Sequence, residues 1–298
     1  MKLLVTGAGG QLATELVRQA GVHQIIALAR TELNIADVAA VFKAVENIAP
    51  DAVVNAAAYT AVDRAESEAK IAFATNRDGP AHLATACAAQ GIPLVHVSTD
   101  YVFDGTKAGA YTEQDSVAPL GVYGLSKAEG EAAVRIALPE HIILRASWIF
   151  SAHGNNFVKT MLRLAGERDE LRVVADQQGC PTAAGDLAAA ILAMLPVAVA
   201  HRGREECWGT YHFCQPEATT WHGFAEAIIN EVRTAGAQSH ALVRVQNIVP
   251  ITTADYPTPA RRPANSVLDC AKLTSVFGIQ PRPWRLSLHE VIQELRSG

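Results

Sequence analysis

The sequence predicts an α/β protein in which a doubly wound parallel sheet is followed by a second, smaller C-terminal domain. Two observations predict the sheet: short β-type runs alternate with Ala-rich segments of helical period, and a glycine-rich loop joins the first strand to the first helix. A third observation predicts the second domain: beyond Arg145 the alternation of strands and helices becomes irregular, and a Pro-rich stretch occupies 256–263. At about 150 residues per domain, 298 residues accommodate both parts.

The elements follow from the spacing of apolar residues. Continuous apolar runs predict buried parallel strands, and apolar residues three or four apart predict the helices between them. Right-handed crossovers then place helices on both faces of the sheet. The expected order is strand 2–5, helix 11–21, strand 24–28, helix 38–48, strand 52–55, helix 66–90, strand 93–98, helix 121–136 and strand 142–145, with later strands at 171–175 and 211–214 and a helix at 185–195.

Charge and apolar patterning exclude two classes of partner. Thirty acidic against 25 basic side chains give a net charge of −5, so no basic surface for nucleic acid is expected. Only three apolar residues precede the glycine loop, fewer than the roughly 7–15 of a signal peptide. The longest apolar run, 187–200, contains Pro196 and is shorter than the roughly 20 residues that cross a bilayer. We therefore expect a cytoplasmic protein with no membrane partner.

Cysteines and histidines show no metal-binding spacing. The five cysteines form no C-x-x-C pair, and the ten histidines form neither H-x-H nor H-E-x-x-H. Buried, reduced thiols and scattered histidines are expected.

The glycine loop predicts a dinucleotide site. Gly7 and Gly10 stand between the first strand and helix 11–21, where backbone N–H groups can approach a pyrophosphate at the positive end of the helix. A dinucleotide-binding (Rossmann) domain is therefore expected over 1–150, with later returns near 171–195 and 211–214. Residues 151–298 are then expected to form mainly the substrate domain.

The end of the second strand favours NADPH. An acidic residue usually stands there when the cofactor has no 2′-phosphate, but this strand ends in Leu28-Ala29-Arg30. Arg30 can neutralise a 2′-phosphate. A solvated surface arginine is the alternative, and NADH stays open.

Small and hydroxyl side chains follow the next strands. Ala58 follows the third strand, where a flat nicotinamide ribose could lie close to the backbone. Ser98 and Thr99 end the fourth strand, at the sheet edge where ligands of such folds bind, although strand-end hydroxyls also cap turns.

Tyr123 and Lys127 carry the strongest chemical signal. Four residues apart on one helix, they share a face. A neighbouring cation stabilises phenolate, so the pair predicts a lowered pKa for Tyr123. Tyr123 could then act as general acid for a carbonyl oxygen that receives hydride.

The motif order, a glycine loop, then Ser-Thr, then Tyr-x-x-x-Lys, resembles the extended short-chain dehydrogenase/reductase superfamily. More specific segments resemble the dTDP-4-dehydrorhamnose reductase family over essentially the whole chain; they are 55–66, 98–105, 145–150, 154–161 and 262–266. The resemblance implies reduction of the C4 ketone of dTDP-4-dehydro-6-deoxy-L-mannose by NADPH or NADH, the last step of dTDP-L-rhamnose synthesis.

The resemblance also implies residue roles. Tyr123 would donate the proton, Lys127 would hold the nicotinamide ribose, and Thr99 would bind the sugar. Further substrate positions would be Val62, Asp100 and Trp148. Cofactor positions would be Gly7, Gly10, Gln11, Leu12, Arg30, Asn34, Ile35, Ala58, Tyr59, Thr60, Val97, Tyr123 and Lys127.

The chain departs from the family pattern near the adenine, where Ala29 and Asn34 replace frequent aspartates. Some members form homodimers around Mg²⁺ held by C-terminal glutamates. Glu290 and Glu294 could serve here, or they could line an ordinary exposed helix face.

Two alternatives belong to other functional classes. A sugar-nucleotide epimerase or dehydratase would return the hydride to the same sugar, but the Asp-Glu pair typical of dehydratases is absent after Thr99. A non-catalytic regulatory subunit of the same fold would need neither Tyr123 nor Lys127.

Overall fold

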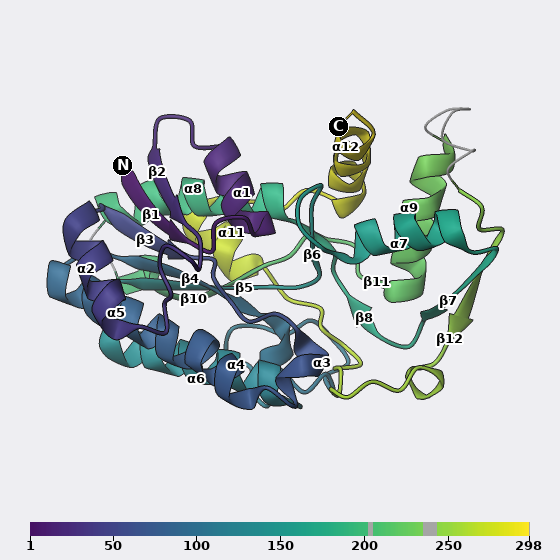
Figure 1. The fold of residues 1–298 in the computed structure, drawn as a ribbon, viewed down its shortest axis with the longest axis horizontal. Coiled ribbons are helices and arrows are strands. Elements are labelled where there is room, and N and C mark those ends of the chain that lie inside the picture. Colours follow the sequence, from purple (N-terminus) through teal and green to yellow (C-terminus); the bar gives the residue numbers. More distant parts are fainter. Residues whose placement is uncertain (202–204, 235–242, 298) are drawn as a thin grey trace.

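A six-stranded parallel sheet forms the centre of the computed structural model, which describes residues 1–201, 205–234 and 243–297 (Figure 1). The strand order is β10-β5-β4-β3-β1-β2. Because β1 pairs with β2 on one side and β3 on the other, the order reverses at β1, where ligands of such sheets bind. The strands are β1 (Lys2–Thr6), β2 (Gln24–Leu28), β3 (Ala52–Asn55), β4 (Leu94–Thr99), β5 (His141–Ala146) and β10 (Gly209–Phe213).

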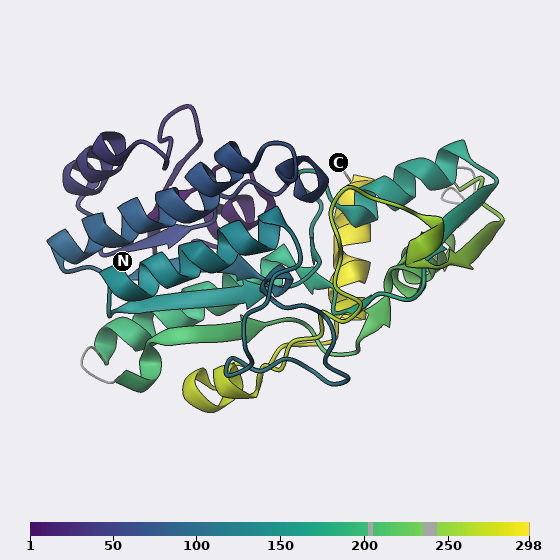
Figure 2. The same cartoon turned by 90° about the horizontal axis from the view of Figure 1, so that it is seen from below.

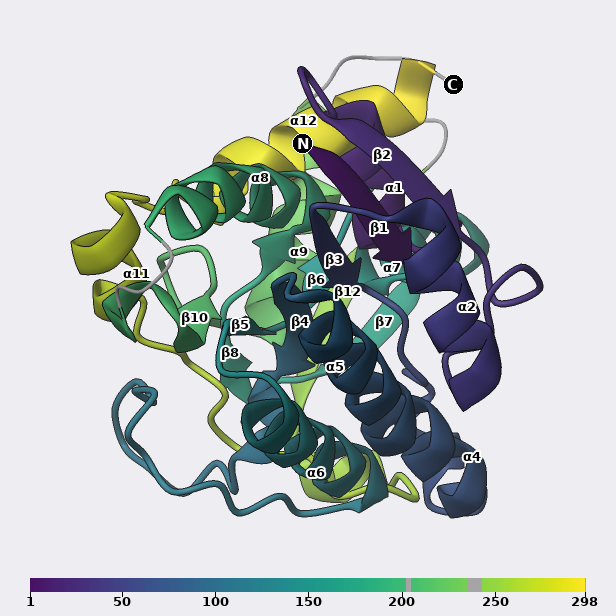
Figure 3. The same cartoon turned by 90° about the vertical axis from the view of Figure 1, so that its left-hand side faces the viewer.

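Helices cover both faces of the sheet, as the sequence predicted (Figure 3). Successive strand side chains point to opposite faces. Leu3 and Val5 pack in one apolar cluster with α1 (Gln11–Arg18) and α8 (Ala184–Ala200). Leu4 packs in another with α2 (Val38–Ile48), α5 (Gly79–Gln90) and α6 (Val122–Ala137).

The helix expected over 66–90 begins later, at Ala69, and contains a π-helical turn. The chain forms α3 (Val62–Ala65), α4 (Ala69–Phe73) and a π-helical turn (Ala74–Asp78) before α5. Asn76, buried in this turn, hydrogen-bonds groups outside the helix. The wider π-helical turn therefore coincides with the residue whose side chain makes these contacts.

A second part of the molecule stands beyond the carboxyl ends of the sheet strands (Figures 1 and 2). Its own apolar cluster includes Phe150, Phe224 and Trp284. It contains α7 (Phe157–Glu167), α9 (Trp221–Thr234), α12 (Trp284–Ser297) and three strand pairs: β6 (Ile149–Phe150) with β9 (Thr182–Ala183), β8 (Gln178–Gly179) with β11 (Thr219–Thr220), and β7 (Glu170–Val174) with β12 (Asn247–Ile251).

The later strands differ in where they pair. β10 lies beside β5 in the central sheet, and the later helix α11 (Ala271–Phe277) contacts β10. The expected return near 171–175 does not occur, because β7 pairs with β12 and buries Leu171 and Val173 in the second cluster. Cys87, Cys180, Cys207, Cys214 and Cys270 are free thiols. Within the described ranges, no helix has the length and apolarity to cross a bilayer.

Candidate active site

The loop between β1 and α1 requires glycine for steric reasons. Gly7 has a φ of +86°, and a Cβ there would lie 2.8 Å from the backbone nitrogen of Ala57. Gly10 precedes α1 and supplies no side-chain cap, so the N–H groups of the first helical turn keep their hydrogen-bonding capacity. This is the arrangement that binds the anionic pyrophosphate of a dinucleotide.

Of the two residues after Gly10, Leu12 can offer this site only its backbone, and Gln11 has its side-chain oxygen engaged elsewhere. Leu12 lies in the sheet core with 6% exposure. The side-chain oxygen of Gln11 accepts hydrogen bonds from Ser151 Oγ (3.1 Å) and Asn156 Nδ2 (3.0 Å). Gln11 thereby ties the glycine loop to the start of the second part of the molecule.

Arg30 and Asn34 are exposed residues after β2. Arg30 has no hydrogen bond or ion pair with any residue that the structure describes, and its guanidinium is therefore available to a ligand. Asn34 Oδ1 accepts from the N–H of Ala36 (3.3 Å). Ile35, by contrast, is 3% exposed and packs against Gly79, so its side chain belongs to the core.

The loop after β3 is fixed by polar contacts. Asn76 accepts from the N–H of Tyr59 (2.8 Å) and donates to its carbonyl (3.0 Å) and to Ser126 Oγ on α6 (3.1 Å). The Tyr59 hydroxyl donates to Glu68 (2.5 Å), which raises the pKa of Tyr59. Ala58 and Thr60, on either side, keep part of their surface open.

Thr99 and Asp100 lie where β4 ends. Thr99 Oγ1 donates to Asp100 Oδ1 (2.9 Å) and accepts from the N–H of Tyr101 (3.2 Å). Both residues are buried, and burial raises the pKa of Asp100 to about 6. Thr99 acts on the pKa of Tyr123, which places the phenol of α6 near this strand end.

The prediction that Lys127 lowers the pKa of Tyr123 is wrong. Burial raises the pKa of Tyr123 to about 12, and the neighbouring Thr99 hydroxyl offsets only part of that rise. Lys127 Nζ instead donates to the carbonyl of Val97 (2.6 Å), and burial lowers its own pKa to about 8. Although Lys127 and Tyr123 share a helix face, the Lys127 ammonium donates its hydrogen bond to the Val97 carbonyl and not to the phenol.

A buried polar chain behind Lys127 escaped the sequence analysis. Asn55 Oδ1 accepts from Thr6 Oγ1 (2.7 Å) and from the N–H of Ala57 (3.2 Å), so Asn55 Nδ2 donates to His96 Nδ1 (3.0 Å). The proton of His96 is then on Nε2, which lies 3.5 Å from Lys127 Nζ. Burial lowers the pKa of His96, so this ring is neutral and offers Lys127 no acceptor.

The hydrogen bond between Asn55 and His96 could have been predicted from the sequence. His96 interrupts an apolar strand, and parallel pairing places it opposite Asn55. Two such polar side chains on adjacent buried strands predict a hydrogen bond between them.

Trp148 lies two residues after the end of β5. Because Ala146, the last residue of β5, pairs with Thr99 on β4, Trp148 lies at the same edge of the sheet as Thr99. Its φ is +47°, a conformation rare for a bulky residue. The indole stacks on Trp221 with ring centroids 3.5 Å apart.

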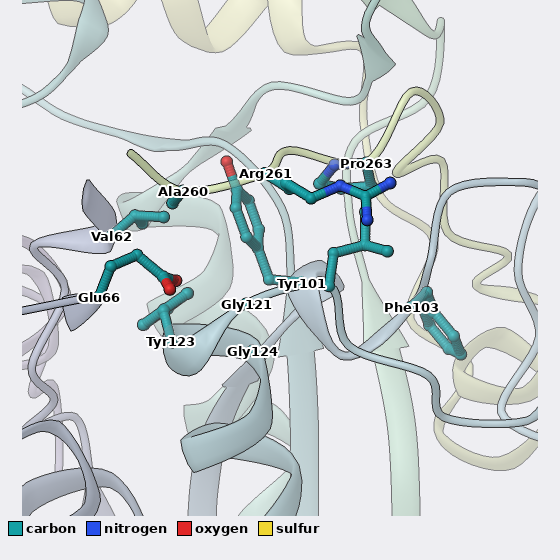
Figure 4. Close-up of a pocket in the computed structure, with 11 residues that line it drawn as sticks. Val62, Glu66, Tyr101, Phe103, Gly121, Tyr123, Gly124, Ala260, Arg261 and Pro263 are labelled. Carbon is teal, nitrogen blue, oxygen red and sulfur yellow. The ribbon is translucent and has the colours of Figure 1, made fainter. Parts of the chain in front are cut away.

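A small pocket opens beside Tyr123 (Figure 4). Val62 and Glu66 form one side, and the chain through Ala260 and Arg261 covers it. Asp63, next to Val62, forms an ion pair with Arg262 (2.8 Å) that holds the Pro-rich stretch against α3.

The two C-terminal glutamates have different surroundings. Glu290 pairs with Arg282 through both oxygens (2.5 and 2.7 Å). Glu294 lies 3.4 Å from His153 Nε2, which is 3.7 Å from the buried Glu15. Glu15 is itself neutralised by Arg18. Two carboxylates, an imidazole and a neighbouring guanidinium do not fit Mg²⁺, which prefers an all-oxygen octahedral shell.

The doubly wound sheet, the glycine loop at a helix N-terminus, and the Thr99, Tyr123 and Lys127 group define an NAD(P)H-dependent oxidoreductase of the short-chain dehydrogenase/reductase type. The model of the RmlD substrate binding domain family matches residues 1–297. A dTDP-4-dehydrorhamnose reductase from Aggregatibacter actinomycetemcomitans is 46% identical over 293 residues, covering 97% of this chain and 98% of the relative. The chain belongs to the dTDP-4-dehydrorhamnose reductase family.

Solved structures agree with this assignment. A dTDP-4-dehydrorhamnose reductase from Clostridium acetobutylicum superposes with a TM-score of 0.91 at 37% identity, covering 99% of this chain and 100% of that one. The Bacillus anthracis reductase in complex with NADP gives 0.88 at 33% identity, covering 98% and 99%. A UDP-glucose 4-epimerase from Thermus thermophilus gives 0.79 at 20% identity over the whole of both chains, which shows the fold alone.

Proposed function

We propose that the protein reduces the C4 ketone of dTDP-4-dehydro-6-deoxy-L-mannose to dTDP-L-rhamnose with NADPH. The observation that carries the proposal is the convergence of Thr99, Tyr123 and Lys127 at one edge of the sheet in a member of this reductase family. The Bacillus anthracis relative was solved with NADP, and Arg30 is free to meet a 2′-phosphate.

The residues around the glycine loop fit a nicotinamide dinucleotide. Gly7 admits the close approach of the Ala57 backbone, and the N–H groups of Gln11 and Leu12, in the first turn of α1, would bind the pyrophosphate. Arg30 and Asn34 would contact the adenosine end, and Ala58, Tyr59, Thr60 and Val97 would lie along the nicotinamide half. The bound cofactor supplies hydride to the ketone carbon. Ile35 supports this site only from the core.

Tyr123 would give its proton to the ketone oxygen. A pKa of about 12 keeps the phenol protonated at neutral pH, which is the form that a proton donor needs. An alkoxide is a stronger base than a phenolate, so transfer of this proton is downhill even from a phenol with a raised pKa. Thr99 would fix the oxygen by a second hydrogen bond once its hydroxyl turns from Asp100 to the ketone.

Lys127 would hold the nicotinamide ribose. Val97 occupies one of its N–H donors, and the neutral His96 accepts none, so the remaining donors can bind ribose hydroxyls. The polar chain of Asn55 and His96 thereby takes none of the remaining donors of Lys127.

The second part of the molecule, mainly residues 151–298, would bind the sugar nucleotide together with Val62, Asp100 and Trp148. A cytoplasmic location is part of the proposal, because free thiols and reduced nicotinamide are both kept there. Mg²⁺ and a homodimer built around it are not part of it, because the donors at Glu15, His153 and Glu294 do not suit that ion.

The direct test is to follow loss of the reduced nicotinamide absorbance with the 4-keto sugar nucleotide, with dTDP-glucose as the control substrate. Stoichiometric oxidation of NADPH and formation of dTDP-L-rhamnose are expected. An epimerase or dehydratase would show no net oxidation, because each returns the hydride to its sugar. A regulatory subunit would show no turnover at all.

A further inference from the structure

Trp148 and Trp221 form a face-to-face stack of two indole rings. The two indoles lie 3.5 Å apart between centroids and only 10° from parallel. Phe157 packs on the same Trp221 ring with a centroid distance of 4.7 Å and a 51° tilt. Trp221 begins α9 in the second part of the molecule, whereas Trp148 follows a strand of the central sheet.

The backbone of Trp148 is fixed in an unfavourable conformation. Its φ of +47° is one that L side chains rarely adopt. Its carbonyl accepts from the N–H of Thr182 (3.2 Å), and Ser147 Oγ donates to the carbonyl of Cys180 (2.7 Å). Such strain persists only where the surroundings enforce it, and it is typical of functional sites.

Gly179 leaves room for the indole of Trp148 on β8. A Cβ on Gly179 would lie 2.4 Å from Cε2 of Trp148 and 2.7 Å from its Nε1. The φ of Gly179 lies outside the left-handed region, so glycine is needed there for space and not for conformation. Trp221 and Gly179 together leave the indole one orientation.

We propose that Trp221 is a positioning residue that, with Gly179, holds Trp148 in the orientation from which it contacts the sugar. The inference rests on the proposed function, in which Trp148 is a substrate contact. Trp221 acts through Trp148 and touches neither the ketone nor the cofactor. Its loss should therefore weaken sugar-nucleotide binding while leaving cofactor binding and the chemical step intact.

The experiment measures the KM for the 4-keto sugar nucleotide, the affinity of the NADP⁺-loaded protein for dTDP-L-rhamnose by calorimetry, and the exciton couplet of the stacked indoles by circular dichroism. In Trp221→Ala we expect the couplet to disappear and both KM and Kd to rise about tenfold, the scale of a lost apolar contact. The kcat should stay within about threefold and the NADP⁺ affinity unchanged. Trp221→Phe should lose the couplet but keep the affinity, because a ring still supports Trp148.

Two further variants complete the test. Trp208→Phe, matched to Trp221→Phe, removes a tryptophan outside the stack and should leave the couplet intact. Gly179→Ala should displace the indole and raise Kd in the same direction, which keeps the inference testable should Trp221→Ala fail to fold. Unchanged Kd in Trp221→Ala after loss of the couplet would overturn the inference. Wild-type protein that shows the couplet but does not bind dTDP-L-rhamnose would instead overturn the proposed function.

Discussion

At the scale of single residues, Tyr123 and Lys127 act through burial more than through each other. Burial raises the pKa of the phenol to about 12 and lowers that of the ammonium to about 8. Desolvation disfavours the charged form of each group, so the pair moves toward neutral phenol and neutral amine. The predicted lowering of the Tyr123 pKa failed because sequence spacing gives a shared helix face but not the acceptor that Lys127 finds at Val97.

Tyr123→Phe should reduce kcat by about 10² or more, because the proton donor to the ketone oxygen is lost. The dissociation constant for NADPH, measured by fluorescence titration, should stay within about twofold. Tyr256→Phe, at an exposed tyrosine, serves as the matched control and should retain full activity. Turnover of Tyr123→Phe within a few-fold of wild type would remove the assigned role.

We expect Lys127 to set an alkaline limit on activity. Since its pKa lies at about 8, the ammonium predominates below that pH and its charge is lost as pH rises through it. We expect kcat/KM for NADPH to fall by about tenfold per pH unit on the alkaline side. In Lys127→Arg, whose guanidinium stays protonated, the limb should move to higher pH. If the alkaline fall in kcat/KM stays at the same pH in that variant, the ionisation belongs to another group.

We expect Arg30 to influence the choice between the two nicotinamide cofactors. Because the guanidinium is exposed and lacks a partner in the described part of the chain, Arg30→Ala should lower kcat/KM for NADPH by about tenfold and leave that for NADH unchanged. Steady-state rates with both cofactors give the ratio. The same ratio in wild type and variant would show that another group reads the 2′-phosphate.

At the scale of elements, the strands were predictable and the interrupted helix was not. Apolar runs placed the first strand at 2–5, and the structure extends it only to Thr6. The π-helical turn before α5 contains Asn76, whose partners Tyr59 and Ser126 are 17 and 50 residues away in the chain. Local periodicity cannot register such distant partners. The pairing of β7 with β12 was missed for the same reason.

Asn76→Ala should destabilise the protein by about 1–3 kcal/mol, because it leaves the N–H and carbonyl of Tyr59 without partners. The loop beside the cofactor should loosen as well, so the KM for NADPH should rise. Urea unfolding measures the first effect, and Asn230→Ala, at an exposed position on α9, should change stability by less than about 0.5 kcal/mol. Equal stability of the two variants would show that the two hydrogen bonds from Asn76 to the Tyr59 backbone add nothing to the free energy of unfolding.

At the scale of the whole molecule, distant segments meet at the carboxyl edge of the sheet. The Asp63 to Arg262 ion pair fastens the Pro-rich stretch over α3, and Gln11 bonds Ser151 and Asn156 across the two parts. The motif order along the chain was sufficient to predict that Thr99, Tyr123 and the glycine loop share an edge, because parallel strands end together. The support from His96 and Trp221 was not predicted, since it depends on strand register and on packing between the two parts.

The most direct test of the account is to run the reaction with NADPH that carries deuterium at the transferring position and to locate the label in the product by NMR. The account predicts deuterium at C4 of dTDP-L-rhamnose for the wild-type protein. It also predicts almost none in the same time for Tyr123→Phe. Label at another carbon, or full labelling by the Phe variant, would contradict the claim that Tyr123 protonates the oxygen of the C4 ketone as hydride reaches its carbon.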